Sequence, residues 1–495
     1  MKKLLLAIDQ GTTGTTALVV TCDGTTLGRA TAEFPQHFPK PGWVEHDARD
    51  IWGSVQKAVT GALASAHVEA DTLGAIGITN QRETTLLWDR ASGEPIHRAI
   101  VWQCRRTAET CDALRRDQRL AESVRAKTGL VIDAYFSATK IAWILDAVPG
   151  ARARADQLAF GTIDSFLVHR LTSGQVHATD ITNASRTLLM DLAKGQWDPD
   201  LCEIFRVPPS VLPRIVASAE VVGTTHGVGF LPDGIPIAGI AGDQQAALFG
   251  QACFAEGDAK CTYGTGAFAL TNIGPRPLLS SHGLVTTVAW RVGQTTTYAL
   301  EGSAFIAGAA VQWLRDGLGL IKSAGEIEAL ARKVESSDGV AFVPALAGLG
   351  APHWDPAARG TIVGITRGTT AAHLARATLE GIAFQVDDLL TAMRADAGCG
   401  LERLRVDGGA SANDLLLQFQ SDLSSVPVER PVEIESTARG AAMLAGLGAG
   451  LLGDLKDVGR MAKVGRRFTP GFSEETRRAH RARWQDAVGR ARSRG

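Results

Sequence analysis

The stretch Asp9-Gln-Gly-Thr-Thr-Gly14 separates two short apolar runs, at residues 4–8 and 15–20. Apolar runs of this length, bounded by polar turn residues, predict a buried hairpin in which Asp9 lies where the first strand becomes the turn. Glycine admits backbone angles that other residues avoid, and threonine adds a hydroxyl donor. Such a turn can point backbone N–H groups at phosphate oxygens, so the stretch predicts a phosphate-binding hairpin.

Two similar turns occur later, at Tyr263-Gly-Thr-Gly266 and at Asp407-Gly-Gly409. Each follows an apolar strand, and ligands of open α/β sheets bind at the ends of strands. Packing alone could require any one of these turns. Three of them at matching positions in two half-chains favour phosphate binding instead.

Strands and helices are expected to alternate along the chain. Residues 74–79, 84–89, 100–103 and 235–241 have strand character, and residues 51–63 have the apolar spacing of a helix that begins near Asp47. Because the second half repeats the scheme of the first, an α/β fold with two domains is predicted, at residues 1–250 and 251–495. A chain of 495 residues also exceeds what one hydrophobic core usually supports.

The amino-acid composition argues against nucleic acid and membranes as binding partners. Lys and Arg total 51 against 52 Asp and Glu, so no basic surplus attracts nucleic acid or an acidic membrane. The seven cysteines form no CxxC pair, which favours a reducing cytoplasm. The longest apolar stretch, residues 438–452, is shorter than the roughly 20 residues of a membrane span. We therefore expect a cytoplasmic protein that acts on a small molecule.

Other nucleotide-binding signatures are missing from the sequence. It contains neither the G-x-x-x-x-G-K-[ST] loop nor the H-R-D and D-F-G pair of protein kinases. A G-x-G-x-x-G pattern does occur at Gly448, Gly450 and Gly453, but it follows an Ala-rich helical stretch instead of a strand. It is interpreted as close helix packing.

Polar residues at strand ends are candidates for a polyol site. Arg82-Glu83 offers a donor and an acceptor side by side, although a solvated ion pair is the simpler explanation of this dipeptide alone. Asp243, directly before Gln244, is placed like a general base for a hydroxyl nucleophile, or else caps the following helix.

Aromatic residues could form the apolar walls of such a site. Trp102, Tyr135 and Phe268 are the candidates, and aromatic side chains at such positions are more often part of the core.

Eight stretches, in order along nearly the whole chain, resemble the glycerol kinases of the FGGY carbohydrate kinase family. They are Asp9-Gln-Gly-Thr-Thr13, Pro39-Lys-Pro-Gly-Trp-Val-Glu-His-Asp47, Gly77-Ile-Thr-Asn-Gln-Arg-Glu-Thr-Thr85, Val101-Trp-Gln-Cys-Arg-Arg106, Gly239-Ile-Ala-Gly-Asp-Gln-Gln-Ala-Ala247, Tyr263-Gly-Thr-Gly266, Gly348-Leu-Gly-Ala-Pro352 and Arg405-Val-Asp-Gly-Gly-Ala410. The stretches from Gly77 and from Val101 are similar to glycerol kinases in particular, whereas the glycine turns are shared by the wider superfamily.

The resemblance implies a fold and a set of site residues. The fold is that of the actin-like ATPases, with two ribonuclease H-like domains and the nucleotide deep in the cleft between them. Glycerol-binding positions of the family fall on Thr12, Arg82, Glu83, Trp102, Tyr135, Asp243, Gln244 and Phe268. Positions that bind ATP or ADP fall on Thr12, Thr13, Gly14, Thr16, Thr265, Gly308, Gln312, Gly409 and Asn413.

The implied reaction is direct in-line transfer of the γ-phosphoryl group of ATP to a hydroxyl of glycerol, with no covalent enzyme intermediate. Asp243 would accept or orient the proton of the attacking hydroxyl. Asp9 would hold Mg²⁺, through water, since Mg²⁺ gives up its hydration reluctantly. Closure of the domains would exclude water from the site.

Thr16 departs from the family pattern. The family usually has arginine at this position, two residues after Gly14, where it reaches the phosphates. Loss of a guanidinium removes a charged contact with several donors, so the resemblance predicts either a lower rate or a compensating Lys or Arg elsewhere.

Three functions remain open on the sequence: a glycerol kinase, a kinase of a related polyol or ketose on the same fold, and an actin-like ATPase that uses nucleotide as a switch. The family analogy also implies a homo-oligomer, a dimer or tetramer.

Overall fold

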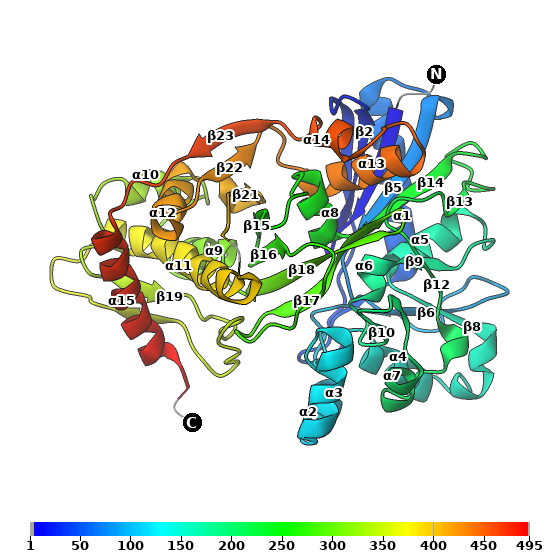
Figure 1. Ribbon diagram of the computed structural model, residues 1–495, viewed down its shortest axis with the longest axis horizontal. Helices are drawn as coiled ribbons and strands as arrows, with labels where there is room; N and C mark the ends of the chain where they lie inside the picture. Colours follow the sequence, from blue (N-terminus) through cyan, green and yellow to red (C-terminus); the bar gives the residue numbers. More distant parts are fainter. Residues whose placement is uncertain (1–3, 399, 494–495) are drawn as a thin grey trace.

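The computed structural model describes residues 4–398 and 400–493, in which strands are arranged in two large sheets (Figure 1). The six-stranded sheet has the order β13-β14-β5-β1-β2-β3. Its strands are β1 (Leu4–Gln10), β2 (Gly14–Thr21), β3 (Thr26–Glu33), β5 (Leu73–Asn80), β13 (Gly223–Thr224) and β14 (Pro236–Gly242). The predicted hairpin is confirmed, because β1 and β2 pair antiparallel around residues 11–13.

The second sheet repeats the centre of the first. It has seven strands in the order β17-β18-β16-β15-β21-β22-β23. They are β15 (Ala259–Tyr263), β16 (Ala267–Asn272), β17 (Val285–Val292), β18 (Thr295–Ala304), β21 (Leu404–Asp407), β22 (Val428–Pro431) and β23 (Val464–Phe468). In each sheet an antiparallel hairpin lies beside a parallel strand, β1–β2 with β5 and β15–β16 with β21. This repeat confirms the predicted duplication.

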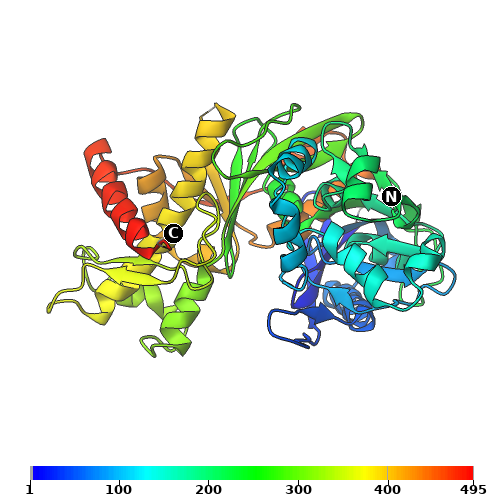
Figure 2. The same cartoon turned by 90° about the horizontal axis from the view of Figure 1, so that it is seen from below.

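Helices cover both sheets. Helix α1 (Ala48–Ala66) begins as predicted, with the Asp47 carboxylate accepting the Arg49 backbone N–H at 2.9 Å. Helices α11 (Ala371–Ala397), α12 (Asp414–Ser424) and α15 (Glu474–Ala491) lie with the seven-stranded sheet (Figure 1). In the view of Figure 2 these C-terminal elements gather on one side, and residues before 250 gather on the other.

Helix α13 (Ser436–Gly448) crosses that division. Although it comes late in the sequence, it packs on β1, β5 and β14 of the first sheet and on α8 (Asp243–Gly250). A methyl group on Gly77 of β5 would lie 2.0 Å from the Ala441 carbonyl oxygen, and one on Gly239 of β14 would lie 2.3 Å from the Ala445 nitrogen. A cluster of buried residues that includes Leu5, Leu270 and Met443 therefore joins the two halves.

Shorter elements surround these layers. Beside the first sheet are β4 (Glu45–His46), β6 (Leu86–Asp89), β7 (Ala99–Ile100), β8 (Leu158–Gly161), β9 (Ala178–Asp180), β10 (Met190–Asp191), β11 (Gln196–Trp197), β12 (Arg214–Val216), α2 (Ala108–Arg115), α3 (Gln118–Thr128), α4 (Ala138–Ala147), α5 (Ile163–Leu171), α6 (Ile181–Ala184), α7 (Pro199–Ile204) and α14 (Leu455–Gly459). With the second are α9 (Gly308–Asp316), α10 (Glu326–Ala331), β19 (Ala341–Val343) and β20 (Thr361–Val363).

The structure differs from the sequence predictions in the bounds of two strands. The strand expected at residues 100–103 is limited to β7, because the chain turns at once, with the Cys104 N–H donating to the Val101 carbonyl at 2.9 Å. The strand expected from residue 84 begins at Leu86. The interpretation of the Gly448 region as close packing is confirmed, since a methyl group there would lie 2.0 Å from the Ala238 carbonyl oxygen. The division at residue 250 stays a prediction.

The structure bears on two expectations from composition, the state of the cysteines and the presence of a membrane span. Five cysteines of the described residues are buried thiols and Cys22 is partly exposed, while Cys399 lies outside the described residues. Within residues 4–398 and 400–493, no helix combines the length and apolar character of a membrane span.

Candidate active site

Glu83 lies at a strained turn that directly follows the central strand β5. Its φ of 58° is in the left-handed region that a residue with a Cβ rarely adopts. The Ser137 hydroxyl and the Lys140 ammonium both donate to the Glu83 carbonyl at 3.1 Å, and Lys140 also donates to the Tyr135 carbonyl at 2.7 Å. Strain that is held by such contacts is typical of functional sites, because it fixes a side chain in one direction.

Arg82 and Glu83 belong to a buried network of charges. The Arg82 guanidinium binds the Glu301 carboxylate with both of its terminal nitrogens, at 2.6 and 3.0 Å. Arg186 donates to Glu83 at 2.7 Å and to Glu301 at 3.0 Å. The four side chains are at most 2% exposed. The explanation of Arg82-Glu83 as a solvated ion pair is therefore wrong.

The network sets the charge of its members. Burial alone would raise the pKa of Glu301, but the cations of Arg186 and Arg82 lower that pKa to about 2. Glu301 is thus a carboxylate, and it holds Arg82 in one orientation. Sequence reasoning missed Glu301 and Arg186. A signal for Glu301 was present, since it is a lone acid in the second half of strand β18 (Thr295–Ala304).

Asp243 lies next to Arg82 at the start of α8. Its Oδ1 is 3.2 Å from the Arg82 Nε, and its side chain is 31% exposed, so it can reach a ligand. Oδ1 also accepts the Gln244 backbone N–H at 2.7 Å, while the helix cap itself is Gly242. Capping alone does not account for an acid that also faces the buried arginine.

Gln244 is held by a lysine that sequence reasoning missed. The Lys260 ammonium, on β15, donates to the Gln244 side-chain oxygen and, at 2.9 Å, to the Thr262 hydroxyl. Lys260 is fully buried, and burial lowers its pKa although the charges of Asp407 and Asp243 oppose this. It is a cation placed among the acids of the site.

Aromatic side chains connect this cluster to the first glycine turn. The Trp102 indole donates to the Thr12 hydroxyl at 3.0 Å, and its ring meets Tyr135 edge to face at 5.7 Å. The Tyr135 hydroxyl accepts from Arg82 at 3.3 Å. Phe268 comes from the other sheet, where it pairs with Ser303 of β18, two residues beyond Glu301.

The first turn keeps its predicted residues together. The Thr13 carbonyl accepts the Phe34 N–H at 3.3 Å, and a methyl group on Gly14 would lie 2.9 Å from the Ala32 carbonyl oxygen, so this turn requires glycine. Thr16 pairs with Asp9 across the hairpin, and its hydroxyl lies 3.0 Å from that of Thr31.

The second turn meets the start of α9. The Thr265 carbonyl accepts the backbone N–H of Ala307 at 2.8 Å and of Ala309 at 3.1 Å, and the Gly308 N–H donates to Gly264 at 2.9 Å. Gln312 lies one turn further along α9 and is exposed. These bonds fix the second turn against the start of α9.

The third turn lies against the second. Gly408 has a φ of 84°, and a methyl group there would lie 2.6 Å from the Tyr263 carbonyl oxygen. Gly409 is open, with no atom within 4 Å of a methyl group in its place. The Asn413 side chain caps α12 by accepting the Leu416 N–H at 2.9 Å. Thr265, Gly308, Gln312, Gly409 and Asn413 are therefore carried by two adjoining turns and the helices that follow them.

Acidic residues crowd around the first hairpin. Burial raises the pKa of Asp9 well above its usual value, and the nearby charges of Asp243, Glu435 and Asp407 raise it further. One carboxylate oxygen of Asp407 is buried without a hydrogen-bond partner. Carboxylates crowded in this way, with Lys260 as the nearby cation, could also accommodate a divalent cation. Among the described residues, no group of three or more His, Cys, Asp or Glu side chains is placed to hold a metal ion.

Comparisons of the sequence match it to a known family. The model of the FGGY family of carbohydrate kinases, N-terminal domain, matches residues 4–250, and that of the C-terminal domain matches residues 259–449. The chain is 56% identical to the glycerol kinase of Myxococcus xanthus, with 99% of each chain covered. It is 57% identical to the glycerol kinase of Alkalilimnicola ehrlichii, with 98% of each covered.

Solved structures agree with the sequence relatives. The glycerol kinase of Plasmodium falciparum with ADP has a TM-score of 0.93 at 36% identity, with 99% of each chain covered. A gluconate kinase from Lactobacillus acidophilus has a TM-score of 0.86 at 22% identity, covering 99% of this chain and 96% of its own, which shows the shared fold alone. The actin-like α/β fold with two domains is thereby confirmed, and the chain belongs to the FGGY family of carbohydrate kinases.

Proposed function

We propose that the protein transfers the γ-phosphoryl group of ATP to a primary hydroxyl of glycerol, giving sn-glycerol 3-phosphate. The observation that carries this proposal is the orientation of Arg82, which Glu301 holds from behind while its Nε faces Asp243. Curated relatives named glycerol kinase, at 56% and 57% identity over nearly the whole chain, support the substrate.

The glycerol site comprises the charged cluster and its aromatic neighbours. Arg82 and Glu83 offer a donor and an acceptor to adjacent hydroxyls, and Gln244 adds an amide. Trp102 and Phe268 are proposed to pack against the carbon atoms, while Tyr135 and Thr12 complete the wall. Fixed donors and acceptors reject molecules that lack matching hydroxyls, because the polar groups would be left unpaired.

The nucleotide site is proposed on the three glycine turns. Thr12, Thr13, Gly14 and Thr16 belong to the first turn, Thr265 with Gly308 and Gln312 to the second, and Gly409 with Asn413 to the third. Backbone N–H groups at these turns suit phosphate oxygens. The buried Lys260 ammonium, which binds the Gln244 side-chain oxygen, is proposed to take part of the role of the arginine that Thr16 replaces.

Asp243 is proposed as the catalytic residue. It orients the attacking hydroxyl for in-line transfer and receives its proton as the new bond forms. Asp9 would hold Mg²⁺ through water, with Asp407 and Asp243 facing the same space. When bound, Mg²⁺ neutralises charge on the phosphates. The strained Glu83 and the buried arginines need no rearrangement during the step, which is the advantage of a preorganised site.

The setting of the reaction is proposed by analogy with the family. We place it in the cytoplasm, in a homo-oligomer, with residues 1–250 carrying the glycerol site and the first hairpin and residues 251–495 carrying most of the nucleotide site.

The test is ADP release from Mg-ATP with and without glycerol, for the protein and for Asp243→Asn. We expect strong stimulation by glycerol that falls at least about a hundredfold in the variant, as for loss of a general base. Asp71→Asn is the matched control, since Asp71 is an exposed aspartate of a short surface 3-10 helix. Stimulation by another polyol or a ketose, but not by glycerol, would contradict the substrate. ATP turnover that ignores every polyol would instead indicate the nucleotide switch.

A further inference from the structure

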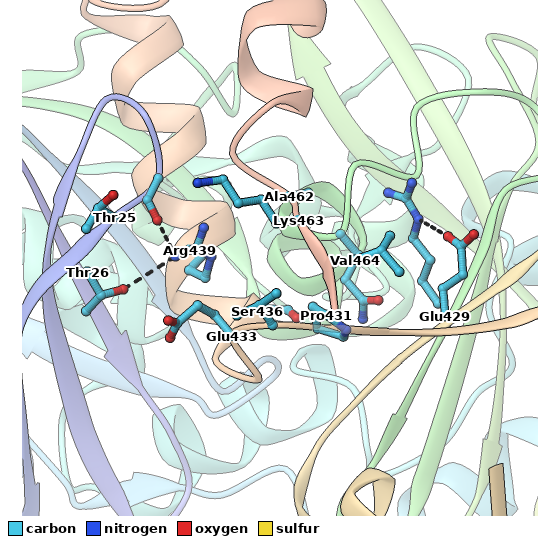
Figure 3. Close-up of a pocket in the computed structure, with 15 residues that line it drawn as sticks. Thr25, Thr26, Glu429, Pro431, Glu433, Ser436, Arg439, Ala462, Lys463 and Val464 are labelled. Carbon is cyan, nitrogen blue, oxygen red and sulfur yellow. Dashed lines mark hydrogen bonds and ion pairs between the residues drawn. The ribbon is translucent and has the colours of Figure 1, made fainter. Parts of the chain in front are cut away.

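In the cavity of about 180 Å³ at the start of α13, the two arginines of the wall already have acidic neighbours (Figure 3). Arg405 pairs with Glu429 at 3.4 Å. Arg439 donates to the Thr26 hydroxyl at 3.4 Å, and burial lowers the pKa of Arg439 while the nearby charge of Glu433 opposes this. Buried polar groups that have no role so far lie instead around the ends of β5 and β14.

Asp180 is at the centre of these groups. It comes directly before α6 (Ile181–Ala184) and is fully buried. Its Oδ1 accepts the Thr182 hydroxyl at 2.8 Å and both the backbone N–H and the side-chain amide of Asn183 at 3.0 Å. Its Oδ2 accepts the Thr182 backbone N–H at 3.0 Å and the Ser218 hydroxyl at 2.8 Å. A buried carboxylate with donors on both oxygens holds each donor in one orientation.

Thr182 connects Asp180 to the end of β14. A hydroxyl carries one proton, and Thr182 donates it to Asp180, so a lone pair of the same oxygen is left to accept the Gly242 backbone N–H at 2.9 Å. Gly242 is the last residue of β14 and lies directly before Asp243. The start of α8, which carries Asp243, is thereby tied to Asp180.

Asn183 connects the same carboxylate to the end of β5. Its amide nitrogen donates to Asp180 and, at 3.0 Å, to the side-chain oxygen of Asn80. The Asn80 amide donates back to the Asn183 oxygen and to the Gln81 carbonyl, each at 3.0 Å. Asn80 is the last residue of β5 and comes two residues before Arg82. The turn that carries Arg82 is thus tied to Asp180 as well.

The two strand ends meet at this point. In the pairing of β5 with β14, Asn80 lies opposite Gly242. Thr182 and Asn183 are adjacent in α6, so one short helix links both strand ends to the same carboxylate. Arg82 and Asp243 follow these ends, and the Arg82 Nε lies 3.2 Å from the Asp243 Oδ1. A shift of either strand end would change that distance.

We propose that Asp180 is a positioning residue for the phosphoryl transfer, which sets the place of Asp243 through Thr182 and that of Arg82 through Asn183. This role rests on the proposed function, in which Asp243 orients the attacking hydroxyl and Arg82 binds glycerol. Asp180 is fully buried and acts through its neighbours. It keeps the base and the glycerol-binding arginine at a fixed separation, so that neither has to move during the step.

The first test is Thr182→Val, which removes the hydroxyl and keeps the shape of the side chain. The Gly242 N–H then loses its acceptor and Asp243 shifts, so we expect kcat with glycerol to fall by about tenfold or more while the KM values for ATP and glycerol change less. Thr182→Ser keeps the hydroxyl and should recover most of kcat.

Thr172→Val is the matched control. The buried Thr172 hydroxyl also accepts a backbone N–H, that of Val176 at 3.2 Å, but it does so at the end of α5. We expect Thr172→Val to lose a similar amount of melting temperature and to keep the kcat of the parent protein.

Asn183→Leu tests the other connection, so that a Thr182 variant that fails to fold still leaves a test. The Asn80 amide loses its partner in Asn183→Leu, and Arg82 lies two residues further along the chain. Because Arg82 is proposed to bind glycerol, we expect the KM for glycerol to rise more than kcat falls. Asp180→Asn, which places an amide nitrogen among these donors, should show both changes.

A crystal structure of Thr182→Val measures the positioning without catalysis. We expect the separation of the Arg82 Nε and the Asp243 Oδ1 to differ from 3.2 Å by about 0.5 Å or more, which exceeds the tolerance of a catalytic site. The proposal is overturned if folded Thr182→Val keeps the parent kcat, if Thr182→Ser does not recover it, if Thr172→Val loses as much activity, or if Asn183→Leu leaves the KM for glycerol unchanged. A parent protein that glycerol fails to stimulate would instead contradict the proposed function, and the crystallographic separation would still test the role of Asp180.

Discussion

At the scale of single residues, Glu301 is the side chain on which the proposed glycerol site depends. In Glu301→Gln, Arg82 loses its two-nitrogen contact to a carboxylate. Arg186 then keeps Glu83, and Arg82 keeps Asp243 at 3.2 Å and Glu83 at 3.9 Å. Removal of one member of a buried ion pair costs about 3–5 kcal/mol of unfolding free energy. We also expect the KM for glycerol to rise more than kcat falls, because Glu301 positions Arg82 and does not touch the transferred group.

Urea unfolding and steady-state kinetics measure both effects. Glu475→Gln is the control, since it alters an exposed glutamate on α15. An unchanged KM in a Glu301→Gln protein that folds would contradict the positioning role.

The same residue predicts how stability depends on pH. The pKa of Glu301 is lowered to about 2 in the folded protein, against about 4.3 for an unperturbed glutamate. A lowered pKa contributes stability above the unfolded value, and this contribution is lost as the pH falls from about 4.3 toward 2. The loss is on the order of 3 kcal/mol. We expect urea titrations from pH 5 to 2.5 to show this slope in the parent protein and a shallower one in Glu301→Gln.

Sequence reasoning finds some of these residues and not others, for a physical reason. Arg82, Asp243 and the glycine turns follow apolar strands directly, so the chain itself marks them. Arg186 and Glu301 act through partners that lie far away in the sequence, such as Arg82 and Glu301 at a separation of 219 residues. Their roles arise only when both sheets are assembled.

At the scale of elements, glycines set how closely α13 packs against α8. A methyl group on Gly440 would lie 1.9 Å from the Ala246 carbonyl oxygen, and backbone atoms cannot yield as a flexible side chain can. We expect Gly440→Ala to lower the melting temperature strongly, by separating the two helices. Gly53→Ala in α1 is the matched change, because no atom lies within 4 Å of its added methyl group.

Alanine at Gly53 should be neutral or stabilising, by up to about 1 kcal/mol, since it improves helix propensity. Differential scanning calorimetry of the two variants compares them directly. Equal melting temperatures of Gly440→Ala and Gly53→Ala would show that α8 and α13 can move apart without loss of stability. Local sequence predicts α1 and its cap well, but it does not reveal which helix covers which sheet.

At the scale of the whole molecule, the repeated hairpins suggest two independent halves, whereas the packing of α13 indicates that they depend on each other. Residues 436–448 cover β1, β5 and β14, and Arg439 donates to Gly24 across 415 residues of sequence. A chain that ends at residue 250 would expose that face of its sheet, including Leu5 and Ala75. The order of motifs could not reveal this, because the covering helix comes after the second sheet.

We therefore expect a fragment of residues 1–250 to be unstable, although it contains a whole sheet. Its exposed apolar face should bind a hydrophobic dye and promote aggregation. In the full-length protein, hydrogen exchange of β1 and β16 amides should report the same free energy of opening, because one shared cluster includes Leu5 of β1 and Leu270 of β16. A fragment in which residues 1–250 are linked to residues 432–463 is the control, and α13 should restore protection of β1 in it. A monomeric 1–250 fragment with protected β1 and β5 amides would contradict the argument, because the first half would then fold without the helix that covers it.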